Sequence, residues 1–133
     1  MIDVESQIFT ILYNAIKAAF PTCDVKSELD LEPARSPAVM IEEINNASNS
    51  QTASTSTTEN HAVIDYEINI FSSKASGRKS EAKAILAVID NVLVPMNFQR
   101  LMTNPVSLSD STRYRLVTRY TAVVGKNEVI YRR

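Results

Sequence analysis

The sequence predicts a single α+β domain, residues 1–133, in which two helices pack on one face of a mostly antiparallel sheet. Two stretches with amphipathic helix spacing are separated by clusters of strand-like segments, so helices and strands do not alternate one by one. Such clustering favours antiparallel pairing over parallel crossovers. The chain has 133 residues, 44% hydrophobic and 22% charged, which fits one soluble domain with one core.

Two helices are predicted, over Asp3–Phe20 and Arg78–Val94. In both, apolar residues recur at the i, i+3, i+4, i+7 spacing of a helix that buries one face. Asp3 is placed to cap the first helix and Pro21 to end it, and Pro95 ends the second. Each helix therefore presents one apolar stripe to the sheet.

Strands are predicted where apolar and polar residues alternate. The clearest are His61–Ser72 and Thr112–Val124, each with one face toward the core and the other toward solvent. Shorter strands are predicted at Cys23–Leu29, Ala38–Ile44 and Glu128–Arg132. The segment Phe98–Val106 is predicted to be a short strand or a turn.

Ser, Thr and Asn dominate the segment Asn45–Asn60 between two predicted strands. It contains nothing that would anchor it in a core, so we expect a long exposed loop that is mobile in the free protein. Both a solvated loop and an arm that becomes ordered on assembly fit this composition. The residues that represent this loop are Asn46, Ser50, Ser54 and Glu59.

The net charge of −1 hides an uneven distribution along the chain. Residues 1–67 hold 3 basic residues against 11 acidic ones, a balance of −8, and residues 68–133 hold 11 against 4, a balance of +7. Such asymmetry indicates either complementary charged surfaces for a partner, or two halves that neutralise each other within one fold.

Three arginines, Arg113, Arg115 and Arg119, are expected on one face of their strand, and Asp65 and Glu67 on one face of another. The arginines fit three interpretations: a solvated face paired with the two acids, a protein interface, or a phosphate-binding stripe. The isoelectric point near 5.8 and the absence of interleaved aromatic residues disfavour a dedicated nucleic-acid reader.

No pattern for catalysis, a metal or a cofactor is present in the sequence. His61 is the only histidine and Cys23 the only cysteine, so neither a cysteine-based metal site nor an intrachain disulfide is expected. The segment Gly77–Ser80 lacks the glycines that a phosphate-binding loop requires. With no apolar run near the roughly 20 residues of a membrane helix and no signal-peptide pattern, we expect a soluble cytoplasmic protein that is not an enzyme.

Several stretches in the second half of the chain have a familiar form: Met96–Leu101 followed by Pro105, the strand Arg113–Tyr120 and the closing Val129–Arg133. Together with the order of elements, they resemble the small tail terminator (tail completion, head-tail joining) proteins of long-tailed phages and prophages of Gram-positive bacteria. The similarity extends over nearly the whole chain.

The resemblance implies an α+β subunit of the virion that forms a ring, commonly a hexamer, at the head-proximal end of the tail tube. It implies three protein partners, namely further copies of the chain, the tail tube protein and the head-neck connector protein. DNA is expected only to pass through the central channel without base-specific binding. The resemblance supplies no catalytic residues. Another phage neck or connector protein, or a non-viral soluble adaptor, remains the alternative.

A ring uses heterologous contacts, in which one surface meets a different surface on the neighbour. The uneven charge distribution suggests that acidic residues of one subunit meet arginines of the next. The hypothesis pairs Asp65, Glu67, Glu42 or Glu43 with Arg113, Arg115 or Arg119.

Overall fold

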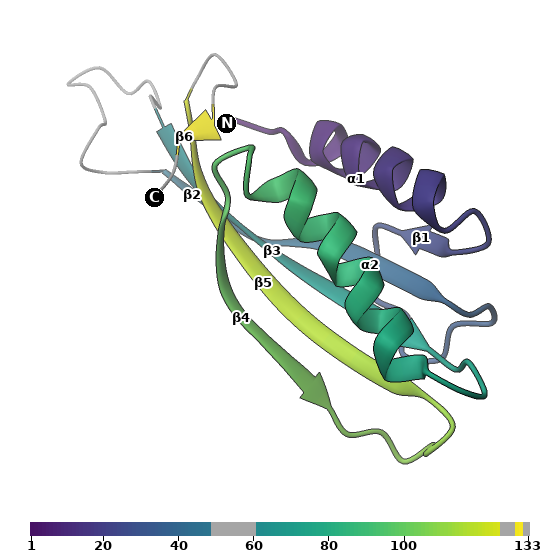
Figure 1. The fold of residues 1–133 in the computed structure, drawn as a ribbon. Coiled ribbons are helices and arrows are strands. Elements are labelled where there is room, and N and C mark those ends of the chain that lie inside the picture. Colours follow the sequence, from purple (N-terminus) through teal and green to yellow (C-terminus); the bar gives the residue numbers. More distant parts are fainter. Residues whose placement is uncertain (49–60, 126–129, 132–133) are drawn as a thin grey trace.

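The computed structural model describes residues 1–48, 61–125 and 130–131, and it confirms the α+β class. Both helices lie on one side of the sheet and share one core with it (Figure 1). In chain order the elements are α1 Glu5–Ala19, β1 Asp24–Lys26, β2 Ala38–Ser48, β3 His61–Ser72, α2 Arg78–Leu93, β4 Gln99–Val106, β5 Tyr114–Gly125 and β6 Ile130–Tyr131.

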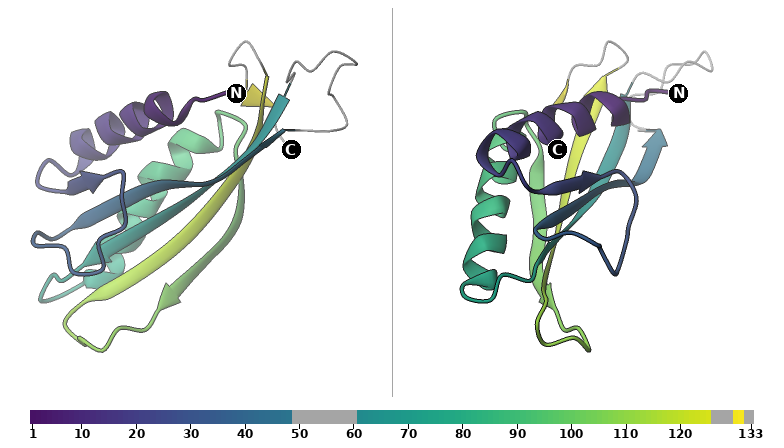
Figure 2. Two further views of the ribbon diagram at one scale, coloured as in Figure 1. Left: turned by 180° about the vertical axis from the view of Figure 1, so that it is seen from behind. Right: turned by 90° about the vertical axis from the view of Figure 1, so that its right-hand side faces the viewer.

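The sheet has the strand order β1-β2-β3-β5-β4, and β6 pairs with β5. Every pairing is antiparallel except that of β1 with β2. The β3–β5 pair is unbroken from His61 opposite Gly125 to Ser72 opposite Tyr114. The sheet is twisted and curved, and the helices lie on one side of it (Figure 2).

The core forms where the apolar stripes of both helices meet the helix-facing side of the sheet. Alternation along β3 buries Ile64 and Tyr66, as the sequence predicted. The fully or nearly fully buried residues of the helices are Ile8, Leu12 and Ile16 on α1 and Ala82, Ile85, Ile89 and Leu93 on α2.

Both helices end within two residues of their predicted bounds, but the N-cap of α1 is Val4 and not Asp3. The backbone N–H of Glu5 donates to Asp3 Oδ1 over 3.1 Å, so the Asp3 side chain satisfies a backbone donor at the start of α1. The end of α2 has the Schellman pattern, since the N–H of Phe98 donates to the carbonyl of Leu93 over 3.0 Å. Asn97 has φ 70° there, and the turn brings Phe98 into the core with no exposed surface.

The predicted end of the second strand was wrong. β2 continues to Ser48 instead of ending at Ile44, so Asn46 is a strand residue opposite Ile64 and not part of the loop. The side-chain amide of Asn46 also donates to the carbonyl of Ile2 over 2.8 Å, a tertiary contact that offsets the poor strand propensity of asparagine. The other residues chosen to represent the loop, Ser50, Ser54 and Glu59, lie outside the described residues.

The segment Phe98–Val106, predicted as a strand or a turn, contains a strand, since β4 pairs with β5 along its length. In the described parts of the chain, no helix is long and apolar enough to cross a membrane.

Leu12 and Ile11 are adjacent on α1, but Leu12 is fully buried whereas Ile11 is 41% exposed. We predict that Leu12→Ala lowers the free energy of unfolding by about 2–5 kcal/mol, because it removes buried methyl groups and leaves a cavity. The control Ile11→Ala should change it by about 0.5 kcal/mol or less. Urea unfolding of both variants checks this, and equal losses would contradict the orientation of α1.

Candidate assembly surface

The side of the sheet that faces away from the helices has no helix over it in the described part of the chain (Figure 2). Because side chains alternate along a strand, this outer face receives Glu67 and Asn69 from β3 and Arg115 and Arg119 from β5. These four residues form a continuous hydrogen-bonded network, which we call the polar ladder. It is the densest cluster of charge that the fold creates from the predicted site residues.

The polar ladder follows directly from strand register. Glu67 lies opposite Arg119, whose Nη2 and Nε atoms lie 2.7 and 2.9 Å from Glu67 Oε2. Asn69 donates to Glu67 Oε1 over 3.3 Å and accepts from Arg115 Nε over 2.9 Å. The guanidinium of Arg115 also lies 5.7 Å from the centre of the Phe71 ring. The network therefore uses both ionic and cation–π contacts.

This face is less solvated than the sequence suggested. Asn69 has no exposed surface, and the Glu67 side chain is 16% exposed against 48% for Arg119. Near the start of β5, Phe71 and Met40 are buried in a second small apolar cluster with Ala38, against which Leu108 packs. The outer face thus combines a partly buried polar centre with an apolar end that is covered within the chain.

The acidic candidates each have a different environment. Asp65 accepts a hydrogen bond of 3.1 Å from the Asn45 side chain. Glu42 lies directly opposite Glu67, so two like charges are neighbours on the outer face. Glu43 points to the helix side, where Tyr66 Oη donates to its Oε1 over 3.2 Å.

Arg113 does not belong to the polar ladder, because β5 begins one residue later, at Tyr114. Its Nη2 instead donates to the carbonyl of Pro33 over 3.1 Å, and its Nε lies 3.7 Å from Asp110 Oδ2. Arg113 therefore ties the segment before β2 to the segment before β5. We expected Arg113 on the same strand face as Arg115 and Arg119, but it lies just before the strand begins.

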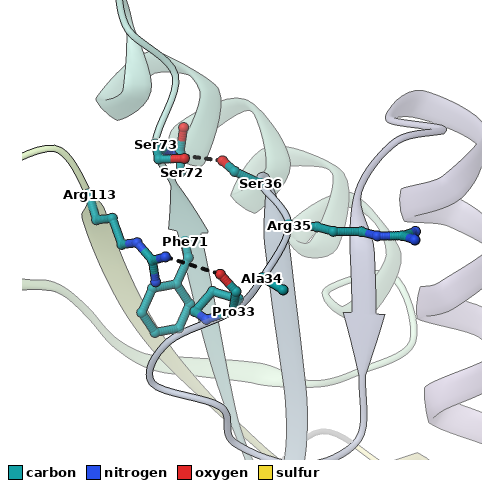
Figure 3. A pocket seen from close by; sticks show the side chains of 8 residues that line it. All are labelled: Pro33, Ala34, Arg35, Ser36, Phe71, Ser72, Ser73 and Arg113. Atoms are coloured by element: carbon teal, nitrogen blue, oxygen red, sulfur yellow. Dashed lines mark hydrogen bonds between the residues drawn. The ribbon is translucent and has the colours of Figure 1, made fainter.

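A pocket that Arg113 helps to line is formed by residues of three segments, and Figure 3 shows how they lie. The N–H of Ser73 donates to Ser36 Oγ over 2.8 Å, and Ser72 Oγ donates to Glu81 Oε1 over 2.7 Å. Arg35 points away from the other lining residues in Figure 3. The polar groups here are engaged in holding loops together, so they do not converge on a ligand.

Charge repulsion and burial act on Glu43. Burial of the carboxyl raises its pKa most, and the nearby carboxylate of Glu5 adds to the rise, with a smaller contribution from Asp3. The hydrogen bond from Tyr66 acts in the opposite direction. Burial also raises the pKa of Tyr66 itself, so its hydroxyl remains a donor at neutral pH.

Metal-binding and nucleophilic groups are not gathered in the described residues. No group of three or more His, Cys, Asp or Glu side chains there is arranged to hold a metal ion. Cys23 is fully buried, and burial raises the pKa of its thiol to about 11, which keeps it protonated and unreactive.

The contribution of the polar ladder to stability can be measured. We predict that Arg119→Glu lowers the free energy of unfolding by about 1 kcal/mol, since it breaks the pair with Glu67 and adds a third carboxylate beside Glu42. The charge swap Glu67→Arg/Arg119→Glu should recover most of this loss in urea unfolding. A swap as unstable as the single variant would show that the pair does not stabilise the sheet.

The same swap tests the hypothesis that acids of one subunit meet these arginines in the next. It retains the pair within the chain but reverses the charges presented outward. The hypothesis therefore expects a smaller or more salt-sensitive oligomer than the unmodified chain forms, measured by light scattering. An unchanged mass would exclude the polar ladder from the contact.

Because its folded-state pKa is raised, Glu43 binds its proton more tightly in the folded than in the unfolded chain. Its contribution to stability is therefore present at low pH and lost as pH rises through the folded-state pKa. We predict that Glu43→Gln is about 0.5 kcal/mol more stable than the unmodified chain at pH 7. Thermal unfolding should show the difference vanish below pH of about 4. A destabilised variant at pH 7 would contradict this.

Comparisons with known proteins show similarity in fold. No protein-family model and no curated protein matches the sequence. Among solved structures, a chain in a structure titled "Virion of native gene transfer agent (GTA) particle" matches with a TM-score of 0.59 and 18% sequence identity. The match covers 83% of this chain and 88% of the other. The α+β fold described above is therefore shared, over most of both chains, with a component of a virion.

Proposed function

We propose that this chain is a structural subunit of a phage-like virion that forms a ring at the head-proximal end of the tail tube. In this role it ends tube polymerisation and joins the tail to the head. The observation on which the proposal depends is the fold shared with a virion chain over 83% of this chain and 88% of that one. The resemblance of the sequence to tail terminators supplies the finer assignment.

The fold has surfaces of the kind that a ring subunit needs. Its helices occupy one side of the sheet, which leaves the outer face, with the polar ladder, available for contacts along the particle. Its two sheet edges differ from one another, and unlike surfaces are what a heterologous ring contact joins. These features support assembly rather than small-molecule chemistry as the role of the chain.

The proposed partners are other copies of the chain, the tail tube protein and the head-neck connector protein. DNA would pass through the centre of the ring, with contacts to phosphates that do not distinguish bases. A hexamer is the expected stoichiometry from the resemblance. The chain would be found in the tail or neck of the virion, and in the host cytoplasm during assembly.

Length control of tail tubes tests this function directly. The purified tail tube protein of the same particle is polymerised with increasing amounts of the chain, and tube lengths are measured by electron microscopy. We expect mean length to fall as the ratio of chain to tube protein rises, with antibody label against the chain at one tube end only. An unrelated soluble protein of similar mass is the control.

Other outcomes would assign other roles. Unchanged tube length together with binding to the connector would indicate a neck protein that does not touch the tube. Label along the tube wall would exclude a terminator, because a terminator binds only the end. No binding to either assembly would overturn the virion role and favour a soluble adaptor.

A further inference from the structure

Both edges of the sheet are open over a stretch of strand. β4 pairs only with β5 in the described residues, and most of its side chains are exposed. At the other edge, β1 pairs with β2 only from Ala38 to Met40, so Ile41–Ala47 has no strand partner on that side among the described residues; the contact there is the Asn46 side chain with the carbonyl of Ile2. Open edges expose backbone donors and acceptors that can pair with another strand.

Each open edge carries a bulge that presents an aliphatic side chain. The register of β4 shifts between Arg100 and Met102, and the intervening Leu101 is 51% exposed. The register of β2 shifts between Glu43 and Asn45, and the intervening Ile44 is 42% exposed. A bulge re-aims a side chain, so each bulge presents one large apolar residue outward.

The charged residues within the two edge strands have opposite signs, and Arg100 on β4 also lies 3.7 Å from Asp90 of its own chain. Arg100 is the only charged residue of Gln99–Val106, and Glu42 and Glu43 are the only charged residues of Ile41–Ser48. Pairing β2 with a second β2 would bring four glutamates together, whereas pairing β4 with β2 brings unlike charges together. Charge therefore favours contact between different edges over contact between identical ones.

Strand direction is also compatible with a ring. β2 and β4 run in opposite directions within one chain, because two antiparallel pairings lead from β2 to β5 and one more leads to β4. If the axis of the ring runs along the strands, rotating one copy onto the next leaves the direction of each strand unchanged. The β4 of one copy would therefore meet the β2 of the next as an antiparallel pair, the more stable arrangement.

We propose that Gln99–Pro105 of one copy pairs antiparallel with Ile41–Ala47 of the next, which continues the sheet from subunit to subunit. The occupant of each open edge is thus a second copy of this chain. This inference rests on the proposed ring, and it names the surfaces that close the ring.

The bulges select one register for this pairing. If the helices of all copies lie on one side, helix-side residues must face helix-side residues. On β4, Arg100 and Thr103 both lie on the helix side, opposite Tyr120 and Thr118 of β5. They are three positions apart instead of two because the bulge adds a residue between them. Within Ile41–Ser48 only Glu43 and Asn46, opposite Tyr66 and Ile64, have that spacing. In this register Arg100 faces Asn46 and Thr103 faces Glu43, with Arg100 diagonal to Glu43.

The same register places Gln99 opposite Ala47, both exposed and both on the outer face. The variant Gln99→Cys/Ala47→Cys therefore tests it by oxidation and electrophoresis without reductant. Three strand spacings of about 4.8 Å separate the two positions within one chain, which prevents an internal disulfide. The native Cys23 is fully buried and does not interfere.

We expect Gln99→Cys/Ala47→Cys to give a ladder of linked species that ends at the mass of the ring. Each single variant alone should give no link, and a mixture of the two single variants should give dimers only. The matched control is Gln99→Cys/Ser48→Cys, since Ser48 is also exposed but lies on the helix side of β2, opposite Ala62. It should form linked species several-fold more slowly.

Five results would overturn the pairing or the ring. Equal rates in the test and control pairs, or links in Gln99→Cys alone, would exclude the proposed register and edge. Rings seen by light scattering without specific links would overturn the edge pairing but leave the proposed function standing. Links that continue into open filaments would support the edge pairing and overturn ring closure. Neither links nor oligomers, with tube length unaffected, would overturn both.

Discussion

The twelve-residue antiparallel pairing of β3 with β5 is the interaction on which the rest of the structure depends. Both strands are central, so every other strand reaches the core through one of them. On the helix side their alternation buries Tyr66 and Tyr120, and Tyr120 Oη donates to Asp90 Oδ1 of α2 over 2.8 Å. A slip of one residue in this register would move every one of these side chains to the other face.

The same register builds the outer face. It places Glu67 opposite Arg119, so the acidic first half of the sequence and the basic second half neutralise each other partly within one chain. That pairing limits how much charge remains for a neighbouring subunit. The polar ladder therefore uses its charges within the chain, and Asn69, which has no exposed surface, links Glu67 to Arg115.

A sheet whose two edges differ is suited to repeated assembly. β4 and the far half of β2 have opposite charge and opposite direction, and each has a bulge with an exposed aliphatic residue. Bulges and charges on edges also prevent indiscriminate association, because only a partner with the matching irregularity pairs well. This combination fits the proposed ring subunit, which has to avoid indiscriminate association and still join identical copies.

The sequence by itself determined the fold class, both helices and the strand His61–Ser72, because hydrophobic periodicity and proline positions are local signals. It also identified the charged residues of the polar ladder, but not the contacts that they make. Only the tertiary structure decided that Asn46 is a strand residue and that Arg113 binds Pro33, because both depend on segments far apart in the chain. The open edges and their bulges likewise appeared only with strand order and register, which are set by long-range pairing and not by composition.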